Sequence, residues 1–82
     1  MPLYFFHWTE DIIEHLTLNG VSPDDFETVV MDEASEVTTS RSTGRPVRIG
    51  FTDDGRLLLC VFDWIDDQET EIEPRTAYEI HA

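Results

Sequence analysis

Arginine is the residue type in this chain whose placement best suits chemistry, because all five basic residues are arginines. Arg41, Arg45, Arg48 and Arg56 are close together in sequence, and Arg75 follows near the C-terminal end. A guanidinium group makes fixed, forked contacts with carboxylate or phosphate groups. We therefore expect either an anion-binding patch, in which Arg41 and Arg45 bind phosphate, or a set of structural ion pairs.

Arg48, Arg56 and Arg75 are the candidate catalytic arginines, together with Tyr78. The arginines come from three successive predicted strands, so an antiparallel sheet could bring two or three of them to one patch near Tyr78 or the loop at residues 42–45. Such a patch would bind a phosphate and stabilise the charge that develops during phosphodiester cleavage, with Tyr78 or an arginine in proton transfer. The alternative is that each arginine pairs with one of the eighteen acidic residues.

Other kinds of reactive site have little support in the sequence. His7, His15 and His81 lack the spacing of paired metal ligands, and the Asp-Asp pairs fall in a helix cap or in turns. No glycine-rich phosphate loop follows a strand, and there is no nucleophilic serine motif. Cys60 lies in an apolar run and is expected to be a buried, unreactive thiol. We therefore expect no metal and no cofactor.

Negative charge dominates the chain, because eighteen acidic residues outnumber five basic ones and leave a net charge of −13. Residues 1–40 hold nine acids and no base, residues 41–56 carry a net +2, and residues 57–82 carry a net −6. This charge excludes DNA and anionic membranes as partners and disfavours RNA. No apolar run approaches the roughly 20 residues that span a bilayer. Without a signal-peptide pattern at its start, the chain is expected to be cytoplasmic.

The first third of the sequence predicts a short strand over residues 3–8 and two helices. Thr9 is placed to cap the first helix, which should stop at Gly20. Ser22 is the expected N-cap of the second helix, with Asp25 completing a capping box, and this helix should end near Asp32.

The rest of the chain predicts four strands. Residues 36–40 suit an exposed strand, and residues 47–52 alternate so that Val47, Ile49 and Phe51 would be buried and Arg48 would lie on the less apolar face. Residues 53–55 form a hairpin turn. Residues 57–65 are apolar on both faces, which predicts a central strand covered on both sides. The last strand should place Ile72, Pro74, Thr76, Tyr78 and Ile80 on one face, with Pro74 at an interruption or a sheet edge.

This order of elements, β-α-α-β-β-β-β, predicts one α+β domain over residues 1–82. We expect two layers, with helices over one face of a curved antiparallel sheet of about four strands.

Five short segments, in this order and spacing, are similar to the motifs of one known family. Residues 6–8 (Phe-His-Trp) precede an acid-containing helix, and residues 19–26 (Asn-Gly-Val-Ser-Pro-Asp-Asp-Phe) join two helices. Residues 45–50 (Arg-Pro-Val-Arg-Ile-Gly), 55–59 (Gly-Arg-Leu-Leu-Leu) and 75–79 (Arg-Thr-Ala-Tyr-Glu) fall in the strand region. Together they resemble the BrnT-type toxins of bacterial type II toxin–antitoxin systems, which are small relatives of the RelE/ParE ribonuclease toxins.

The resemblance implies a RelE-like fold and an RNA-cleaving toxin that blocks translation and is neutralised by a small antitoxin protein. Arg48, Arg56 and Arg75 match the basic strand positions of that family. The first helix departs from the family, which has Lys or Arg where this chain has Glu14 and Thr17. A second hypothesis therefore stays open: a catalytically silent protein-binding module of the same fold, with an acidic interaction surface.

Overall fold

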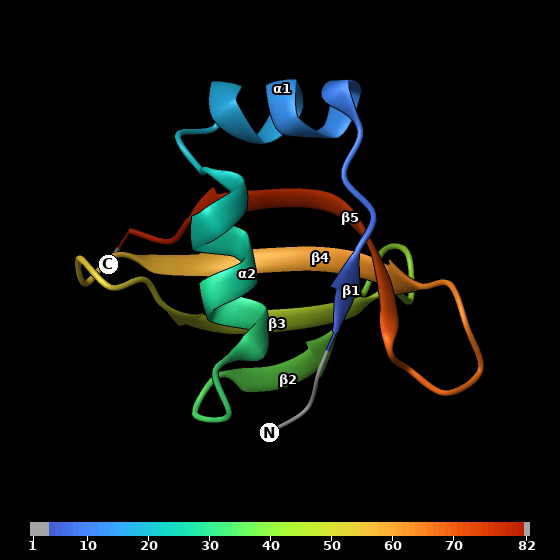
Figure 1. Ribbon diagram of the computed structural model, residues 1–82. Helices are drawn as coiled ribbons and strands as arrows, with labels where there is room; N and C mark the ends of the chain where they lie inside the picture. Colours follow the sequence, from blue (N-terminus) through green and yellow to red (C-terminus); the bar gives the residue numbers. More distant parts are fainter. Residues whose placement is uncertain (1–3, 82) are drawn as a thin grey trace.

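The chain folds into five strands and two helices in the order that the sequence predicts (Figure 1). A computed structural model describes residues 4–81. The elements are β1 (Phe5–Phe6), α1 (Glu10–Leu18), α2 (Pro23–Met31), β2 (Glu36–Thr39), β3 (Pro46–Phe51), β4 (Leu57–Trp64) and β5 (Glu71–Glu79). The domain is therefore α+β.

The strands form one sheet in the order β1-β5-β4-β3-β2. The four strands from β2 to β5 are antiparallel, as predicted, and β4 lies at the centre of the sheet. The N-terminal strand β1 joins the same sheet and runs parallel to β5, with Phe5 opposite Glu71 and Phe6 opposite Ile72. The sheet is thus mixed and five-stranded rather than antiparallel with about four strands, because β1 adds a parallel strand at one edge. The two helices then carry the chain across the sheet to β2 at the opposite edge.

The two helices begin and end where the sequence places their caps. The backbone N–H of Ile12 donates to Thr9 Oγ1 at 3.2 Å, and the N–H of Asp25 donates to Ser22 Oγ at 3.1 Å. The reciprocal bond from Ser22 N–H to Asp25 Oδ2 is 3.4 Å, so the predicted capping box is present. Gly20 takes a left-handed φ of 79° between the helices. Neither helix in this described part of the chain is long and apolar enough to cross a membrane.

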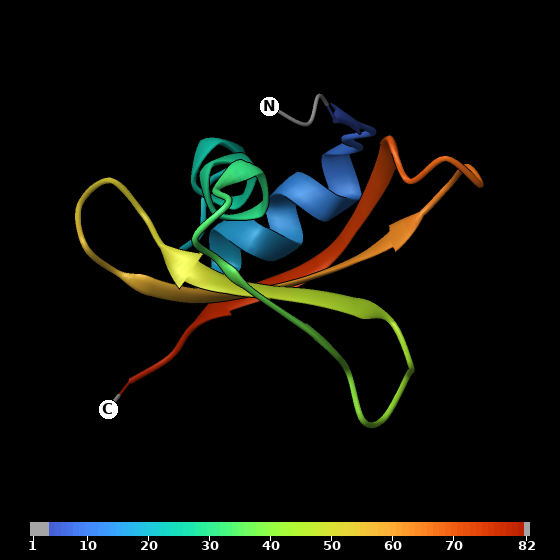
Figure 2. The same ribbon diagram turned by 90° about the horizontal axis from the view of Figure 1, so that it is seen from below.

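Both helices cover the same face of the sheet (Figure 2). α2 buries Phe26, Val29 and Val30, whereas Leu16 is the one fully buried residue of α1. α1 lies beside β5 (Figure 1). There the side-chain amide of Asn19 donates to the Ala77 carbonyl at 3.0 Å and so occupies part of a strand edge that β1 does not reach.

β4 shows that only one face of the sheet is enclosed. Cys60 and Phe62 point to the helices and are 0% and 1% exposed, whereas Leu59 and Val61 point the other way and are only partly buried. Burial raises the pKa of the Cys60 thiol to about 12, with a smaller contribution from the Asp25 charge, in agreement with a buried, unreactive thiol. The expectation that β4 is covered on both sides is wrong, because both helices lie on one side. We call the uncovered side the open face.

β3 is turned over relative to its predicted orientation. Arg48 pairs with Cys60 and Gly50 with Leu58, so both face the helices, and Val47, Ile49 and Phe51 lie on the open face. Val47 is buried as expected, at 3% exposed, whereas Phe51 is 59% exposed. The cause is a close approach at Gly50, where a Cβ would lie 2.1 Å from Ser35 Oγ. The absence of a side chain lets the segment after α2 pack on the sheet, and Ser35 is fixed there by its bond to the Val29 carbonyl.

β5 changes face part-way along its length. Val61 pairs with Thr76 but Phe62 pairs with Pro74, so Arg75 is an extra residue in a bulge. Pro74 therefore faces the helices, whereas Thr76 and Tyr78 lie on the open face, and the expectation that these three share a face is wrong. Pro74 lies beyond the two residue pairs of β1, at an edge that the described strands leave unpaired, which suits its missing N–H.

Candidate functional site

The structure does not gather the three candidate catalytic arginines into one patch. Arg48 lies on the helix side of β3, Arg75 lies on the open face of β5, and Arg56 lies at the turn between β3 and β4. The three arginines also differ in the side chains that they contact.

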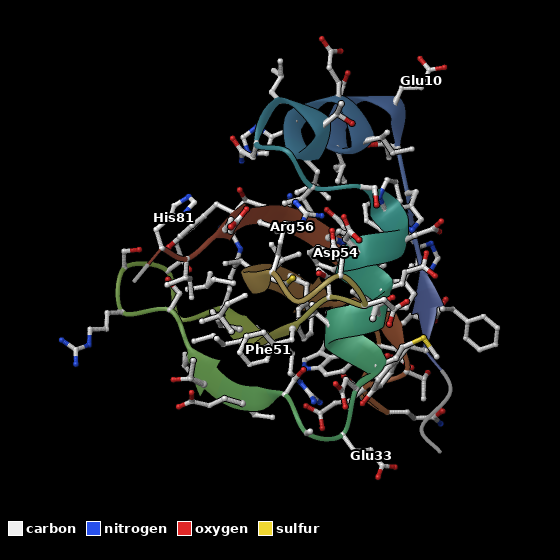
Figure 3. All side chains as sticks on the ribbon, turned by 90° about the vertical axis from the view of Figure 1, so that its left-hand side faces the viewer. Glu10, Glu33, Phe51, Asp54, Arg56 and His81 are labelled. Carbon is white, nitrogen blue, oxygen red and sulfur yellow. The ribbon has the colours of Figure 1, made fainter. Side chains whose placement is uncertain are left out.

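Arg56 connects the sheet to the helix layer. Figure 3 shows Arg56 beside Asp54. Arg56 Nη2 is 2.6 Å from Asp25 Oδ2, and its Nη1 donates to the Gly20 carbonyl at 2.9 Å. Its Nε is 3.3 Å from Asp54 Oδ2, and Asp54 also accepts from the Thr52 hydroxyl. Burial lowers the pKa of Arg56, but the bonds and charges of Asp54 and Asp25 outweigh this effect and the pKa is raised. Arg56 is therefore held by acidic and backbone partners from its own turn and from the helix layer.

Arg45 and Arg75 meet at Asp63 on the open face. Asp63 Oδ2 is 3.1 Å from Arg45 Nε and 2.7 Å from Arg75 Nε, and Glu73 lies 2.9 Å from Arg75 Nη2. The hydrogen bond to Asp63, with the charges of Glu73 and Asp63, raises the pKa of Arg75 against a smaller opposing effect of burial. The positive charges of the two guanidinium groups are thus largely neutralised by the two carboxylates.

A hollow of about 410 Å³ adjoins this cluster. Its lining brings together Arg45, Arg75 and Tyr78, three of the predicted site residues, with the hydroxyl groups of Ser42 and Thr43. Part of the predicted patch is therefore assembled, although its two arginines are ion-paired.

Arg48 lies in a separate cleft of about 780 Å³ on the helix side of the sheet, beyond α2. Its Nη2 donates to the Tyr4 hydroxyl at 3.4 Å. Tyr4, Phe62 and Trp64 form an aromatic wall, with ring centroids 5.7 Å apart for Tyr4 and Trp64 and 5.1 Å apart for Phe62 and Trp64. β2 lines the cleft along one side with Val37, Thr38 and Thr39.

The loop between β4 and β5 forms the other side of this cleft and is fixed by Asp66. The backbone N–H groups of Thr70 and Glu71 each donate to Asp66 Oδ1 at 3.0 Å. The Thr70 hydroxyl, with these N–H groups, lowers the pKa of Asp66. Glu69 takes a left-handed φ of 58° in this loop and lines the cleft.

Within residues 4–81, Arg48 and Arg41 are the two arginines without an acidic partner. All eighteen acidic side chains lie within residues 4–81, and ion pairs there involve Arg45, Arg56 and Arg75. Arg41 is exposed on the hairpin between β2 and β3. The sheet therefore has one uncompensated cation in a cleft and one on a hairpin.

No protein-family model, curated protein or solved structure matches this chain. The case for a function therefore rests on its own residues.

The helix layer exposes several acidic side chains. α1 exposes Glu10, Asp11 and Glu14, and Figure 3 shows Glu10 on its outer side. Among the described residues none of these three has a cationic partner within ion-pair distance. Leu18, at 80% exposed, and Ile13 add apolar area to the same helix.

Sequence reasoning missed the aromatic cleft around Arg48. Its parts come from the residue before β1, from β2, β3 and β4, and from the loop before β5, so no local sequence motif indicates it. The sequence does contain two aromatic residues of the cleft, Tyr4 in the opening aromatic run and Trp64 at the end of the central strand, but they are far apart in the chain.

Proposed function

We propose that this protein is a protein-binding module that takes a cationic segment of a partner on α1, without ribonuclease activity. The observation that carries the proposal is the division of the arginines: Arg56 and Arg75 are held by acids in different places, and Arg48 is on the opposite face from Arg75. Arginines stabilise the transition state of phosphodiester cleavage when they are aimed together at one phosphate.

The surface of α1 supports a cationic partner. Three exposed acids and two exposed apolar residues on one short helix suit a segment that alternates basic and apolar side chains. The net charge of −13 also accelerates the approach of a cation and repels nucleic acid. In a toxin–antitoxin system, this partner would be the antitoxin.

Binding of a lysine- and leucine-rich amphipathic peptide, measured by fluorescence anisotropy, tests this proposal. The triple variant Glu10→Gln, Asp11→Asn, Glu14→Gln should weaken binding about tenfold, which corresponds to about 1.4 kcal/mol. The matched control removes three negative charges outside α1, by the substitutions Asp53→Asn, Asp67→Asn and Glu69→Gln.

Equal weakening in both triple variants would mean that the peptide senses net charge alone, and would overturn the assignment to α1. Weakening confined to the α1 variant supports it.

A ribonuclease of the toxin type is the second candidate, because Arg45, Arg75 and Tyr78 do line one hollow. Its test is cleavage of RNA by the purified protein and arrest of translation on expression, each repeated with Tyr78→Phe. We expect neither activity, because Asp63 and Glu73 neutralise both arginines. Cleavage at physiological salt that is lost in Tyr78→Phe would replace the binding-module proposal.

A further inference from the structure

We propose that the exposed edge of β2 and the Arg48 cleft beside it bind an extended peptide that carries a carboxylate side chain. This surface lies away from α1 and is independent of the proposed cationic partner. Three observations support it: the open edge of β2, the form of the cleft, and the uncompensated charge of Arg48.

β2 ends the sheet and pairs with β3 alone among the described strands. In an antiparallel ladder, hydrogen-bonded and non-bonded residue pairs alternate. Ser40 N–H donates to the Arg45 carbonyl at 2.8 Å, so the next pair, Thr39 with Pro46, is a non-bonded one, consistent with the missing N–H of proline. Thr39 and, two residues earlier, Val37 therefore direct their N–H and C=O groups outward, where another strand can pair with them.

The cleft has the form of a groove along this edge. Val37 is 65% exposed, and Thr38 and Thr39 are also exposed, so the β2 side does not enclose a small ligand. Sites for small molecules bury most of the ligand surface. A strand added to β2 would instead place every second side chain on the cleft side of the sheet, beside Val37 and Thr39.

The charge of the groove selects a carboxylate. Residues 37–52 contain three arginines and no acid, in a chain that is otherwise strongly negative. Arg48 lies directly across the ladder from Val37, and within residues 4–81 its side chain makes one hydrogen bond, the long one of 3.4 Å to the Tyr4 hydroxyl. Glu69 is the one acidic residue of the cleft lining and lies on the opposite side, in the β4–β5 loop. A carboxylate reaching Arg48 from a β2-paired strand would form a charge-assisted hydrogen bond.

The test is a titration of ¹⁵N-labelled protein with a short capped peptide of valine and threonine around one central glutamate. The expected result is movement of the amide signals of Val37, Thr39 and Arg48 with a dissociation constant below about 1 mM. Replacing the peptide's glutamate by glutamine should weaken binding about tenfold, as should Arg48→Gln. Arg75→Gln, on the open face, should leave the affinity within about twofold. The amide spectrum of each variant checks that it is folded.

Methylation of the peptide's backbone nitrogens separates strand pairing from a simple salt bridge, because it removes the donors and keeps the carboxylate. We expect this peptide not to bind. No binding of the parent peptide at about 1 mM, equal binding of the glutamine peptide, equal loss in Arg75→Gln, or retained binding of the methylated peptide would each overturn the proposal.

Discussion

The two faces of the sheet carry similar apolar side chains but differ in what covers them. On the helix side, Leu58, Cys60 and Phe62 of β4 are enclosed by Phe26, Val29 and Val30 of α2. On the open face, Leu57, Leu59 and Val61 of the same strand have no helix above them, and Tyr78 and Phe51 beside them are largely exposed. Period-two patterning therefore reports which residues share a face, and does not report whether a layer covers that face.

The difference follows from the amount of chain available. Two helices of nine residues each supply the entire second layer, and α1 contributes a single fully buried side chain. α2 alone spans the middle of one face. The open face is covered only in part, by the twist of the sheet and by the hairpin between β2 and β3. This hairpin and the C-terminal segment both extend to the side away from the helices (Figure 2).

The largest contrast between the faces is expected in the reactivity of Cys60, which lies at the centre of the enclosed side. Alkylation by iodoacetamide near pH 8 should be at least about a thousandfold slower in the folded protein than in denaturant, because reaction has to await unfolding. The raised thiol pKa acts in the same direction, since it lowers the thiolate fraction. Rapid labelling of the native protein would show that the helix side is open too.

Replacement of Phe62 by Ala should lower the free energy of unfolding by about 3–5 kcal/mol. The ring is 1% exposed and contacts Trp64 edge to face, so its removal leaves a cavity in the core. Urea denaturation followed by circular dichroism measures the change. Phe62 also lines the Arg48 cleft, so this variant is used to measure stability and is not used in the peptide-binding test.

Leu59→Ala is the matched change on the open face of the same strand. Its side chain is only partly buried, so we expect a loss of about 1 kcal/mol, from part of the transfer free energy of the removed carbons. A loss as large as that of Phe62→Ala would mean that the open face is covered in solution, for example by a second copy, and dilution would then lower the unfolding midpoint.

The sequence predicts the helices better than the faces of the strands. The caps at Thr9 and Ser22 are local chemistry, and the structure confirms both. The orientation of β3 depends on Gly50, where packing of Ser35 decides which face is turned inward, and the face change in β5 depends on the bulge at Arg75. Both are tertiary effects that a single-strand pattern does not contain. For the same reason the predicted arginine patch is only partly assembled, at Arg45, Arg75 and Tyr78.

Arg75→Gln should have the smallest effect, with no measurable change in the unfolding midpoint. Asp63 keeps its 3.1 Å contact with Arg45, and Glu73, which loses its partner, has a side chain that is 37% exposed, so water solvates the carboxylate that is left unpaired. Exposed ion pairs contribute little to stability.

Arg56→Gln is the control with the same change in charge. It should lower the midpoint, because Arg56 joins the turn before β4 to Asp25 and Gly20 at the start of α2. Equal effects of the two substitutions, measured by thermal unfolding at one ionic strength, would show that the link between the layers contributes no more than a surface ion pair. The stability of the helix-covered face would then come from apolar packing alone, and the two faces would differ only in the area that each one buries.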